Sequence, residues 1–231
     1  MKWRSLDESS TGVDTRSLRE QFAERKALIA KYVVPEVQAV HARVIQELKE
    51  QRAAERALAR GAPAPEFELH DQDGERLSSQ EVLATSGLVV CFFRGRWCPF
   101  CVGQLEAMNL VLPQIAAAGA TLVAISPQTV RQSFFMADQH KLRFPLLSDG
   151  RNQVARRFGL VYQVPEYQRS VYQRAFVNLP VANGDDSWEL PIPATYIVGR
   201  DGMVRYAALD ADYSVRPEPA ELLAALIPGK V

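Results

Sequence analysis

The feature that most constrains this chain is an apolar strand pattern that leads directly into a Cys-x-x-Cys motif. Residues 88–93 are all apolar, which is typical of a strand buried on both faces of a sheet. The motif Cys98-Pro99-Phe100-Cys101 follows closely. Pro99 suits the first turn of a helix, where a missing N–H costs no hydrogen bond. The pattern therefore predicts a strand, a short loop and a helix that begins at the cysteine pair.

The position of Cys98 at the start of this helix indicates thiol redox chemistry. The positive end of a helix dipole favours the thiolate, which is the reactive form. Cβ atoms three residues apart on a helix are ~5–6 Å apart, whereas a disulfide needs ~3.5–4.5 Å. The two cysteines can therefore bond if Cys98 lies just outside the first turn. We expect an ionised, reachable Cys98 with Cys101 beside it.

Zinc binding is the alternative use of a Cys-x-x-Cys pair. A structural zinc ion needs about four ligands at set spacing. The third cysteine, Cys91, lies in the predicted buried strand, and His41, His70 and His140 are isolated from one another. We therefore predict no metal site and interpret Cys91 as a small core residue.

Composition narrows the function classes further. The chain of 231 residues carries 27 basic and 27 acidic residues, so no basic field is available for nucleic-acid binding. Neither a signal-peptide core nor a membrane-spanning apolar run is present in the sequence. Three cysteines fit a reducing compartment. We expect a cytoplasmic protein that binds neither nucleic acid nor membrane, and no cofactor, because no glycine-rich phosphate loop occurs.

The chain divides at a Gly- and Pro-rich segment, residues 61–65. Before it, two helical stripes are separated by Pro35. We therefore predict an N-terminal helical extension, 1–60, and a main domain, 61–231. The two helices are expected to pack against the main domain or a dimer partner, the alternative being a separate functional module.

Strand and helix patterns alternate along the main domain, which predicts an α/β sandwich with mixed strand directions. An insert of about thirty residues, 160–190, interrupts the alternation. The first predicted strand begins at Phe67, and the others cover 88–93, 121–126, 144–147, 194–198 and 203–208. The predicted helices cover 99–117, 130–139, 152–158 and 217–226.

Four motifs occur in the order found in the AhpC/TSA family, and the chain resembles its peroxiredoxin-like branch. They extend over residues 61–228, about three quarters of the chain. The resemblance implies a thioredoxin-like three-layer α/β/α sandwich with a mixed central sheet. The motifs are Phe93-Arg94-Gly95-Arg96-Trp97-Cys98-Pro99-Phe100-Cys101, Val123-Ala124-Ile125-Ser126-Pro127-Gln128, Phe144-Pro145-Leu146-Leu147-Ser148-Asp149 and Leu190-Pro191-Ile192-Pro193-Ala194-Thr195-Tyr196-Ile197-Val198.

The resemblance also implies roles for single residues. Cys98 resembles the attacking cysteine and Cys101 its resolving partner, and the pair would be recycled by a thioredoxin- or glutaredoxin-type protein. Pro193 resembles the cis-proline that thioredoxin folds place opposite the cysteine pair, with a trans proline opening a strand as the alternative. The resemblance further implies a homodimer. The residues expected to line the substrate site are Trp97, Pro99, Pro193 and Thr195.

The chain departs from the Pro-x-x-x-Thr-x-x-Cys motif of typical peroxiredoxins, because Cys91 and Gly95 occupy the Pro and Thr positions. Pro193 replaces the arginine of the later strand. The cations nearest in sequence to the attacking cysteine are Arg94 and Arg96. We predict that Arg94 and the backbone N–H groups of the first helical turn stabilise charge on the departing peroxide oxygen, with a structural salt bridge as the alternative role for Arg94.

These observations predict a thiol peroxidase that reduces hydrogen peroxide or alkyl hydroperoxides. A protein thiol–disulfide oxidoreductase also fits the Trp-Cys-x-x-Cys motif, and a redox-sensing interaction protein is a third reading. The insert, residues 160–190, favours peroxide if it caps the site and excludes protein substrates.

Overall fold

The computed structural model describes residues 16–227, and a seven-stranded sheet forms its centre. β3 pairs in parallel with β4 and antiparallel with β8, so the predicted mixed sheet is confirmed. In the order β2-β1-β5-β4-β3-β8-β9, the strands are β1 (Glu68–His70), β2 (Arg76–Ser78), β3 (Gly87–Phe92), β4 (Ala120–Ser126), β5 (Leu146–Ser148), β8 (Ala194–Val198) and β9 (Val204–Leu209).

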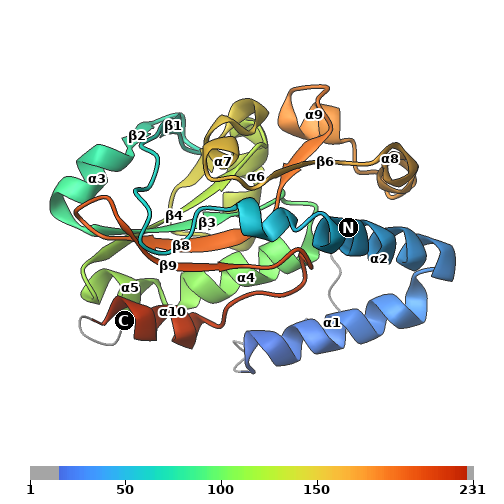
Figure 1. The fold of residues 1–231 in the computed structure, drawn as a ribbon, viewed down its shortest axis with the longest axis horizontal. Coiled ribbons are helices and arrows are strands. Elements are labelled where there is room, and N and C mark those ends of the chain that lie inside the picture. Colours follow the sequence, from blue (N-terminus) through green and yellow to red (C-terminus); the bar gives the residue numbers. More distant parts are fainter. Residues whose placement is uncertain (1–15, 228–231) are drawn as a thin grey trace.

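Helices cover both faces of the sheet, which confirms the three-layer α/β/α sandwich. Figure 1 shows α4, α5 and α10 below the sheet and α7 above it. The helices are α1 (Leu18–Tyr32), α2 (Pro35–Glu50), α3 (Ser79–Thr85), α4 (Pro99–Leu110), α5 (Leu112–Ala117), α6 (Val130–His140), α7 (Gln153–Arg157), α8 (Glu166–Arg174), α9 (Leu179–Asn183) and α10 (Pro219–Leu226), with short 3-10 turns at Ala53–Arg56 and Gly150–Asn152.

The central strand β3 is apolar throughout because both of its faces are covered. Val89 and Cys91 join the core beneath α4, whereas Val90 and Phe92 join the core on the opposite face with Phe158. This two-sided burial is the physical reason for the uninterrupted apolar run in the sequence. It also confirms the interpretation of Cys91 as a core residue.

The single helix predicted for 99–117 is wrong at one point. α4 ends at Leu110, and α5 begins at Leu112 with Pro113 in its first turn. Pro113 has no N–H to donate to the carbonyl four residues back, and its ring would clash with that carbonyl. The chain therefore leaves the helix at Val111 and starts a new one.

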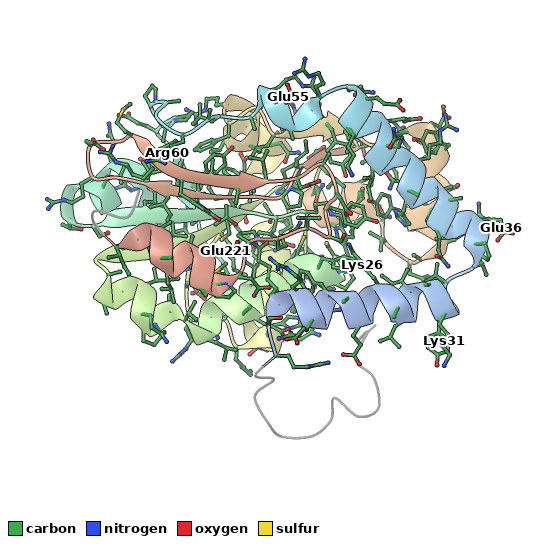
Figure 2. The ribbon with its side chains drawn as sticks, turned by 60° about the horizontal axis from the view of Figure 1, so that its bottom comes forward. Lys26, Lys31, Glu36, Glu55, Arg60 and Glu221 are labelled. Carbon is green, nitrogen blue, oxygen red and sulfur yellow. The ribbon has the colours of Figure 1, made fainter. Side chains whose placement is uncertain are left out.

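Two N-terminal helices form, as predicted, and the second begins at Pro35. Ser17 caps α1, and its capping box includes Glu20, while Pro35 occupies the first turn of α2. α1 packs against α4, and Figure 2 shows Lys26 on the side of α1 that faces the rest of the molecule. The domain boundary at residue 60 stays a prediction, and residues 1–15 and 228–231 lie outside the described range.

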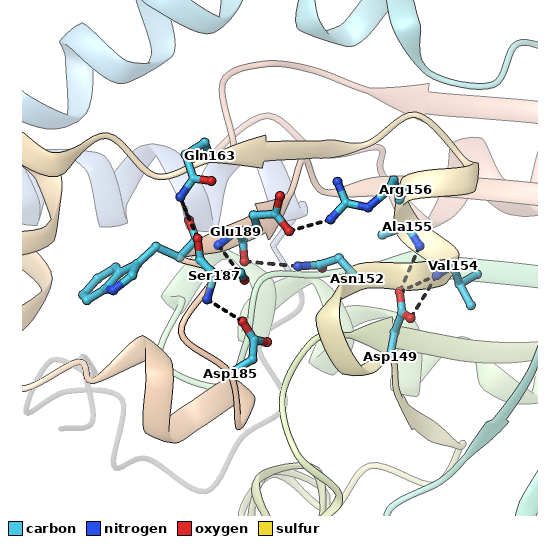
Figure 3. A network of polar contacts seen from close by, with 10 residues as sticks. Asp149, Asn152, Val154, Ala155, Arg156, Gln163, Asp185, Ser187 and Glu189 are labelled. Atoms are coloured by element: carbon cyan, nitrogen blue, oxygen red, sulfur yellow. Dashed lines mark hydrogen bonds and ion pairs between the residues drawn. The ribbon is translucent and has the colours of Figure 1, made fainter.

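The insert forms a small structured unit rather than an irregular loop. β6 (Val161–Gln163) and β7 (Glu189–Pro191) pair antiparallel, with α8 and α9 between them. Asn152 and Arg156 bind the backbone and side chain of Glu189, and the Asp149 carboxylate accepts two backbone N–H groups at the start of α7 (Figure 3). The two bonds to Glu189 fix the insert against the main domain, and the Asp149 bonds hold the start of α7 in place.

Across residues 16–227, no helix has the length and apolar character needed to cross a bilayer.

Candidate active site

Cys98 occupies the N-cap of α4, just outside the first helical turn, as predicted. Its Sγ accepts the backbone N–H of Cys101 at 3.4 Å, and all three cysteines are free thiols. The loop before it needs glycine, because Gly95 has φ +148° and a Cβ there would lie 2.6 Å from the Trp97 indole nitrogen. Strand, loop and helix therefore hold the Cys98 sulfur at the positive end of α4.

Arg94 is the cation that contacts this sulfur. Its Nη2 donates to Cys98 Sγ at 3.1 Å, and the residue is only 3% exposed. The ring of Tyr213 stacks on the guanidinium at 3.7 Å, and that of Trp97 lies at 5.0 Å. Arg96 points elsewhere, because its Nε donates to Gln132 Oε1 on α6 at 2.6 Å. Of the two arginines that the sequence offered, the structure therefore places Arg94 at the site.

A second arginine reaches the site from a segment that sequence reasoning missed. Residues 210–218, here called the strap, connect β9 to α10 and pass beside α4 (Figure 1). Arg216 in the strap donates from Nη2 to Cys101 Sγ at 3.6 Å. No local pattern in the sequence signals this contact, since the two residues are 115 positions apart.

The two thiols have opposite protonation preferences. Burial disfavours the Cys98 thiolate, but the hydrogen bond from Cys101 and the charges of Arg94 and Arg216 outweigh it and hold the pKa of Cys98 well below the ordinary thiol range. Burial, together with the hydrogen bond and negative charge of Cys98, raises the pKa of Cys101 well above that range. The reduced site therefore holds one negative charge, on Cys98, and one proton, on Cys101.

The expectation that Cys98 is reachable is wrong for this reduced form, because the residue has no exposed surface. Aromatic side chains from distant elements cover the site. Tyr172 of α8 packs edge-on against Trp97 with ring centroids 5.1 Å apart. The ring of His41 on α2 lies 6.1 Å from that of Tyr172 and 6.2 Å from that of Tyr213. The insert and the N-terminal extension thus both help to close the site.

Several buried polar atoms around the cysteines lack hydrogen-bond partners within the described part of the chain. They are Arg94 Nε and Nη1, Trp97 Nε1, Tyr172 Oη and Arg216 Nε. Buried donors without acceptors are costly and uncommon in proteins. A small molecule with two oxygen acceptors would satisfy donors of this kind beside the Cys98 sulfur.

The remaining predicted site residues divide into two groups. Trp97 and Pro99 flank Cys98 directly, and Trp97 contacts Arg94. Thr195 is fully buried in β8, where its Oγ1 accepts from Gln104 at 3.0 Å and lies 3.8 Å from Cys91 Sγ. Its hydroxyl therefore serves the core beneath α4, and its role toward substrate stays a prediction.

The predicted cis bond at Pro193 is wrong, because every peptide bond between described residues is trans. Pro193 directly precedes β8. Proline at the start of a strand interrupts no ladder hydrogen bond, so the ordinary trans form suffices there. The alternative of a trans proline that opens a strand is the one the structure adopts.

Comparison with known proteins places this geometry in a family context. Residues 60–207 match the AhpC/TSA family. Rice chloroplastic peroxiredoxin Q is 28% identical over 149 residues, covering 64% of this chain and 58% of that protein. Escherichia coli peroxiredoxin Bcp is 31% identical over 103 residues, covering 45% and 65%. The matched part thus spans less than two thirds of these relatives.

Solved structures share the fold at low sequence identity. Peroxidoxin BcpB from Mycobacterium tuberculosis superposes with a TM-score of 0.58 at 21% identity, covering 73% of this chain and 96% of that one. Xanthomonas campestris peroxiredoxin Q gives 0.55 at 21% identity, covering 71% and 92%. These likenesses extend the agreement from single motifs to the arrangement of the sheet and its helices.

Proposed function

The chain belongs to the AhpC/TSA family, and on that premise we propose that it is a thiol peroxidase that reduces hydrogen peroxide or small alkyl hydroperoxides. One observation carries the proposal: the Cys98 sulfur, which has no exposed surface, accepts hydrogen bonds from both the Arg94 guanidinium and the backbone N–H of Cys101. Relatives named peroxiredoxins support the same chemistry.

In the first step, the Cys98 thiolate attacks the terminal peroxide oxygen. An S–O bond forms, the O–O bond breaks, and an alcohol or water leaves once a proton reaches the departing oxygen. The product on Cys98 is a sulfenic acid. Arg94, whose buried Nε and Nη1 atoms have no acceptor within hydrogen-bond distance, would stabilise the charge that develops on that oxygen.

A low thiol pKa alone does not make a fast peroxidase, which is why Arg94 matters. Lowering a thiol pKa from ~8.5 to ~6 raises the thiolate fraction at pH 7 about thirtyfold. Nucleophilicity falls by ~10–18-fold over the same change for a Brønsted coefficient of ~0.4–0.5. The net gain is about two- to threefold, so most of the acceleration must come from stabilisation of the leaving oxygen.

In the second step, the Cys101 thiolate attacks the oxidised sulfur. An S–S bond forms between Cys101 and Cys98, and hydroxide leaves as water after taking a proton. An external dithiol protein of the thioredoxin or glutaredoxin class would then reduce the disulfide and complete the cycle. This reductant, a homodimeric assembly and a cytoplasmic setting are parts of the same proposal.

The competing activity is exchange with protein disulfides, which the Cys98-Pro99-Phe100-Cys101 motif favours. Exchange requires the attacking sulfur to touch a sulfur of another protein. Cys98 has no exposed surface, and two of its neighbours are themselves covered: Tyr172 packs against Trp97, and Tyr213 stacks on Arg94. A substrate of a few heavy atoms needs a smaller opening to reach this sulfur than a polypeptide does.

The experiment compares peroxide and protein-disulfide substrates. Rapid mixing with hydrogen peroxide, followed by acid quench and mass spectrometry, should show oxidation of Cys98 far faster than that of a free thiol of equal pKa, while insulin reduction stays slow. Cys98→Ser should lose this reaction, and Cys101→Ser should accumulate sulfenic acid. Cys91→Ala is the matched control and should react like the parent.

The opposite pattern, with fast insulin reduction and slow peroxide oxidation, would establish protein-disulfide exchange instead. Slow turnover with both substrates, accompanied by an oxidation-dependent change in assembly, would indicate a redox sensor. Size-exclusion chromatography with light scattering on the reduced and oxidised chain provides that last measurement.

A further inference from the structure

The strap places a cation at the second sulfur of the site. Arg216 Nη2 donates to Cys101 Sγ, whereas Arg94 donates to Cys98 Sγ. Each of the two sulfurs therefore has its own guanidinium. Arg216 is half-buried: its Nε is buried without a partner in the described part of the chain, and its Nη1 donates to the Val215 carbonyl at 2.8 Å. These contacts hold the guanidinium beside Cys101.

We propose that Arg216 is a catalytic residue of the resolving step: its guanidinium stabilises the thiolate that forms on Cys101 once Cys98 has been oxidised, and so accelerates disulfide closure. This inference rests on the proposed peroxidase function and assigns it a residue that neither the cysteine motif nor the family motifs contain.

A charge balance over the first step explains why Cys101 needs its own cation. Cys98 begins as the thiolate and Cys101 as the thiol, and the backbone N–H of Cys101 donates to Cys98 Sγ. Attack on the peroxide makes a neutral sulfenic acid at Cys98, and the proton of Cys101 can pass to the departing oxygen. Thiolate, thiol and hydroperoxide thus become sulfenic acid, alcohol and thiolate, with one negative charge before and after.

The negative charge has then moved from Cys98 to Cys101, and Arg216 is the donor in contact with its new location. The charge that raised the pKa of Cys101 in the reduced site is gone, while the charges of Arg216 and Arg94, which oppose that rise, remain. In the second step this thiolate attacks Cys98 Sγ, the S–O bond breaks, and hydroxide takes a proton from solvent.

The strap is anchored at both ends, so the guanidinium is positioned before oxidation occurs. Asp212 accepts from the backbone N–H and hydroxyl of Ser214 and forms an ion pair with Lys26 of α1 at 3.8 Å. Glu218 accepts the backbone N–H groups of Leu18 and Arg19 at the start of α1. Both anchoring carboxylates are thereby engaged with α1 or the strap itself.

Few other groups around the pair can change charge near neutral pH. Burial, with Arg94 nearby, lowers the pKa of His41 to about 4, and burial raises that of Cys91 to about 12. The pKa values of Tyr162, Tyr172 and Tyr213 are all raised, chiefly by burial. The pH dependence of disulfide closure near neutral pH therefore reports mainly on the two cysteines of the site.

The kinetic test follows the two steps separately. One equivalent of hydrogen peroxide is mixed with the parent, Arg216→Gln and Arg216→Lys, and the sulfenic acid is trapped with dimedone at successive times. In Arg216→Gln we expect sulfenic acid formation to change little at a pH where Cys98 is fully ionised, and its conversion to disulfide to slow about tenfold or more. Arg216→Lys should recover most of this loss. Arg205→Gln, an exposed arginine of β9 paired with Asp201, is the control and should match the parent.

The pH profile distinguishes catalysis from a structural role. We expect the inflection of the closure rate to move to higher pH in Arg216→Gln and to stay in place in Arg216→Lys. Slower closure in Arg216→Gln at every pH, with the inflection unmoved, would mean that Arg216 only holds the strap, and the proposal would be wrong.

A second measurement needs no peroxide and keeps the proposal separate from the proposed function. In Cys98→Ser, residue 98 is neutral, as in the sulfenic acid, and thiolate absorbance at 240 nm reports ionisation of Cys101. Adding Arg216→Gln should move that titration to higher pH by about one unit or more. An unmoved titration would overturn the inference even if the parent is a fast peroxidase. A moved titration with no fast peroxide reaction would overturn the peroxidase proposal and leave the pairing of Arg216 with the Cys101 thiolate.

Discussion

Arg94 carries its charge into a site that is almost fully buried, and its acceptor there is a sulfur rather than a carboxylate. Burial opposes the charge, but the negative charge at Cys98 more than compensates and raises the pKa of Arg94. The guanidinium and the thiolate therefore stabilise one another. A cation held in this way needs no reorganisation when charge develops on a peroxide oxygen.

At the residue scale we predict a contrast between Arg94 and Arg96. Arg94→Ala should lower the rate of Cys98 oxidation by peroxide about 10²-fold, the usual cost of losing one preorganised donor. The oxidation rate of Arg94→Lys should lie between those of the parent and Arg94→Ala, because lysine keeps the charge but loses the forked set of guanidinium donors. Arg96→Ala should stay within about twofold of the parent, since Arg96 binds Gln132. Equal rates for Arg94→Ala and Arg96→Ala would remove Arg94 from the mechanism.

Sequence reasoning found Cys98, Cys101 and Arg94 because all three lie within one short motif whose local geometry is set by a strand and a helix. It could not find Arg216, Tyr172 or Tyr213, because they reach the site from the strap and the insert. Nothing in the local sequence of the strap or of α8 shows which distant element they will contact, and only the tertiary fold decides it. Burial of Cys98 was missed for the same reason.

At the scale of elements, the contact between α1 and α4 depends on a glycine. A Cβ on Gly103 would lie 2.8 Å from Phe22 Cε1 and 3.0 Å from Arg25 Nη1, closer than side chains normally approach. Phe22 also packs edge-on against Phe100, next to the cysteine pair. The glycine therefore sets how closely α1 approaches α4.

Gly103→Ala should destabilise the protein, although alanine favours helices by about 1 kcal/mol over glycine. Overpacking at a tight contact costs ~1–3 kcal/mol, so we expect a net loss of about 1 kcal/mol in the free energy of unfolding, measured by urea denaturation. In a Phe22→Ala background the same substitution should become neutral or stabilising, because the clash is gone. Stabilisation in both backgrounds would show that the two helices do not meet as described.

Elements with a clear apolar period or a proline at their boundary were predictable, and short elements were not. β3, β4, α6 and the two N-terminal helices follow their apolar patterns and flanking prolines closely. β6, β7 and α9 each contain five residues or fewer, which is too short for a pattern to distinguish a strand from a helix. They form because the insert packs against α2 and α7, a tertiary effect with no local signature.

At the scale of the whole molecule, the closed site makes stability depend on pH through His41. Burial and the charge of Arg94 lower its pKa from 6.5 to about 4. The unfolded chain therefore binds a proton at higher pH than the folded chain does. The neutral imidazole therefore makes its full contribution to the free energy of unfolding above pH 6.5. That contribution is lost as the pH falls from 6.5 through about 4, and it amounts to at most about 3 kcal/mol.

His41→Asn should remove this part of the acid sensitivity, because asparagine keeps an acceptor for the Gln168 amide and cannot be protonated. The free energy of unfolding, measured between pH 7 and 4, should fall less steeply in His41→Asn than in the parent. His140→Asn, which alters a histidine on α6 paired with Glu106, provides the comparison. An equal slope for His41→Asn and the parent would show that the pKa of His41 does not differ between the folded and the unfolded chain.

The position of Cys101 in the first turn of α4 bears on how the chain survives excess oxidant. A sulfenic acid on Cys98 forms at the N-cap of α4, where the backbone N–H of Cys101 contacts its sulfur, so Cys101 lies within one helical turn of the oxidised atom. A second peroxide must diffuse in and compete with an intramolecular partner, whose effective concentration far exceeds that of any dissolved oxidant. Irreversible conversion to sulfinic acid should therefore be rare, and the chain should withstand repeated exposure at doses that inactivate thiol enzymes whose resolving cysteine lies far away.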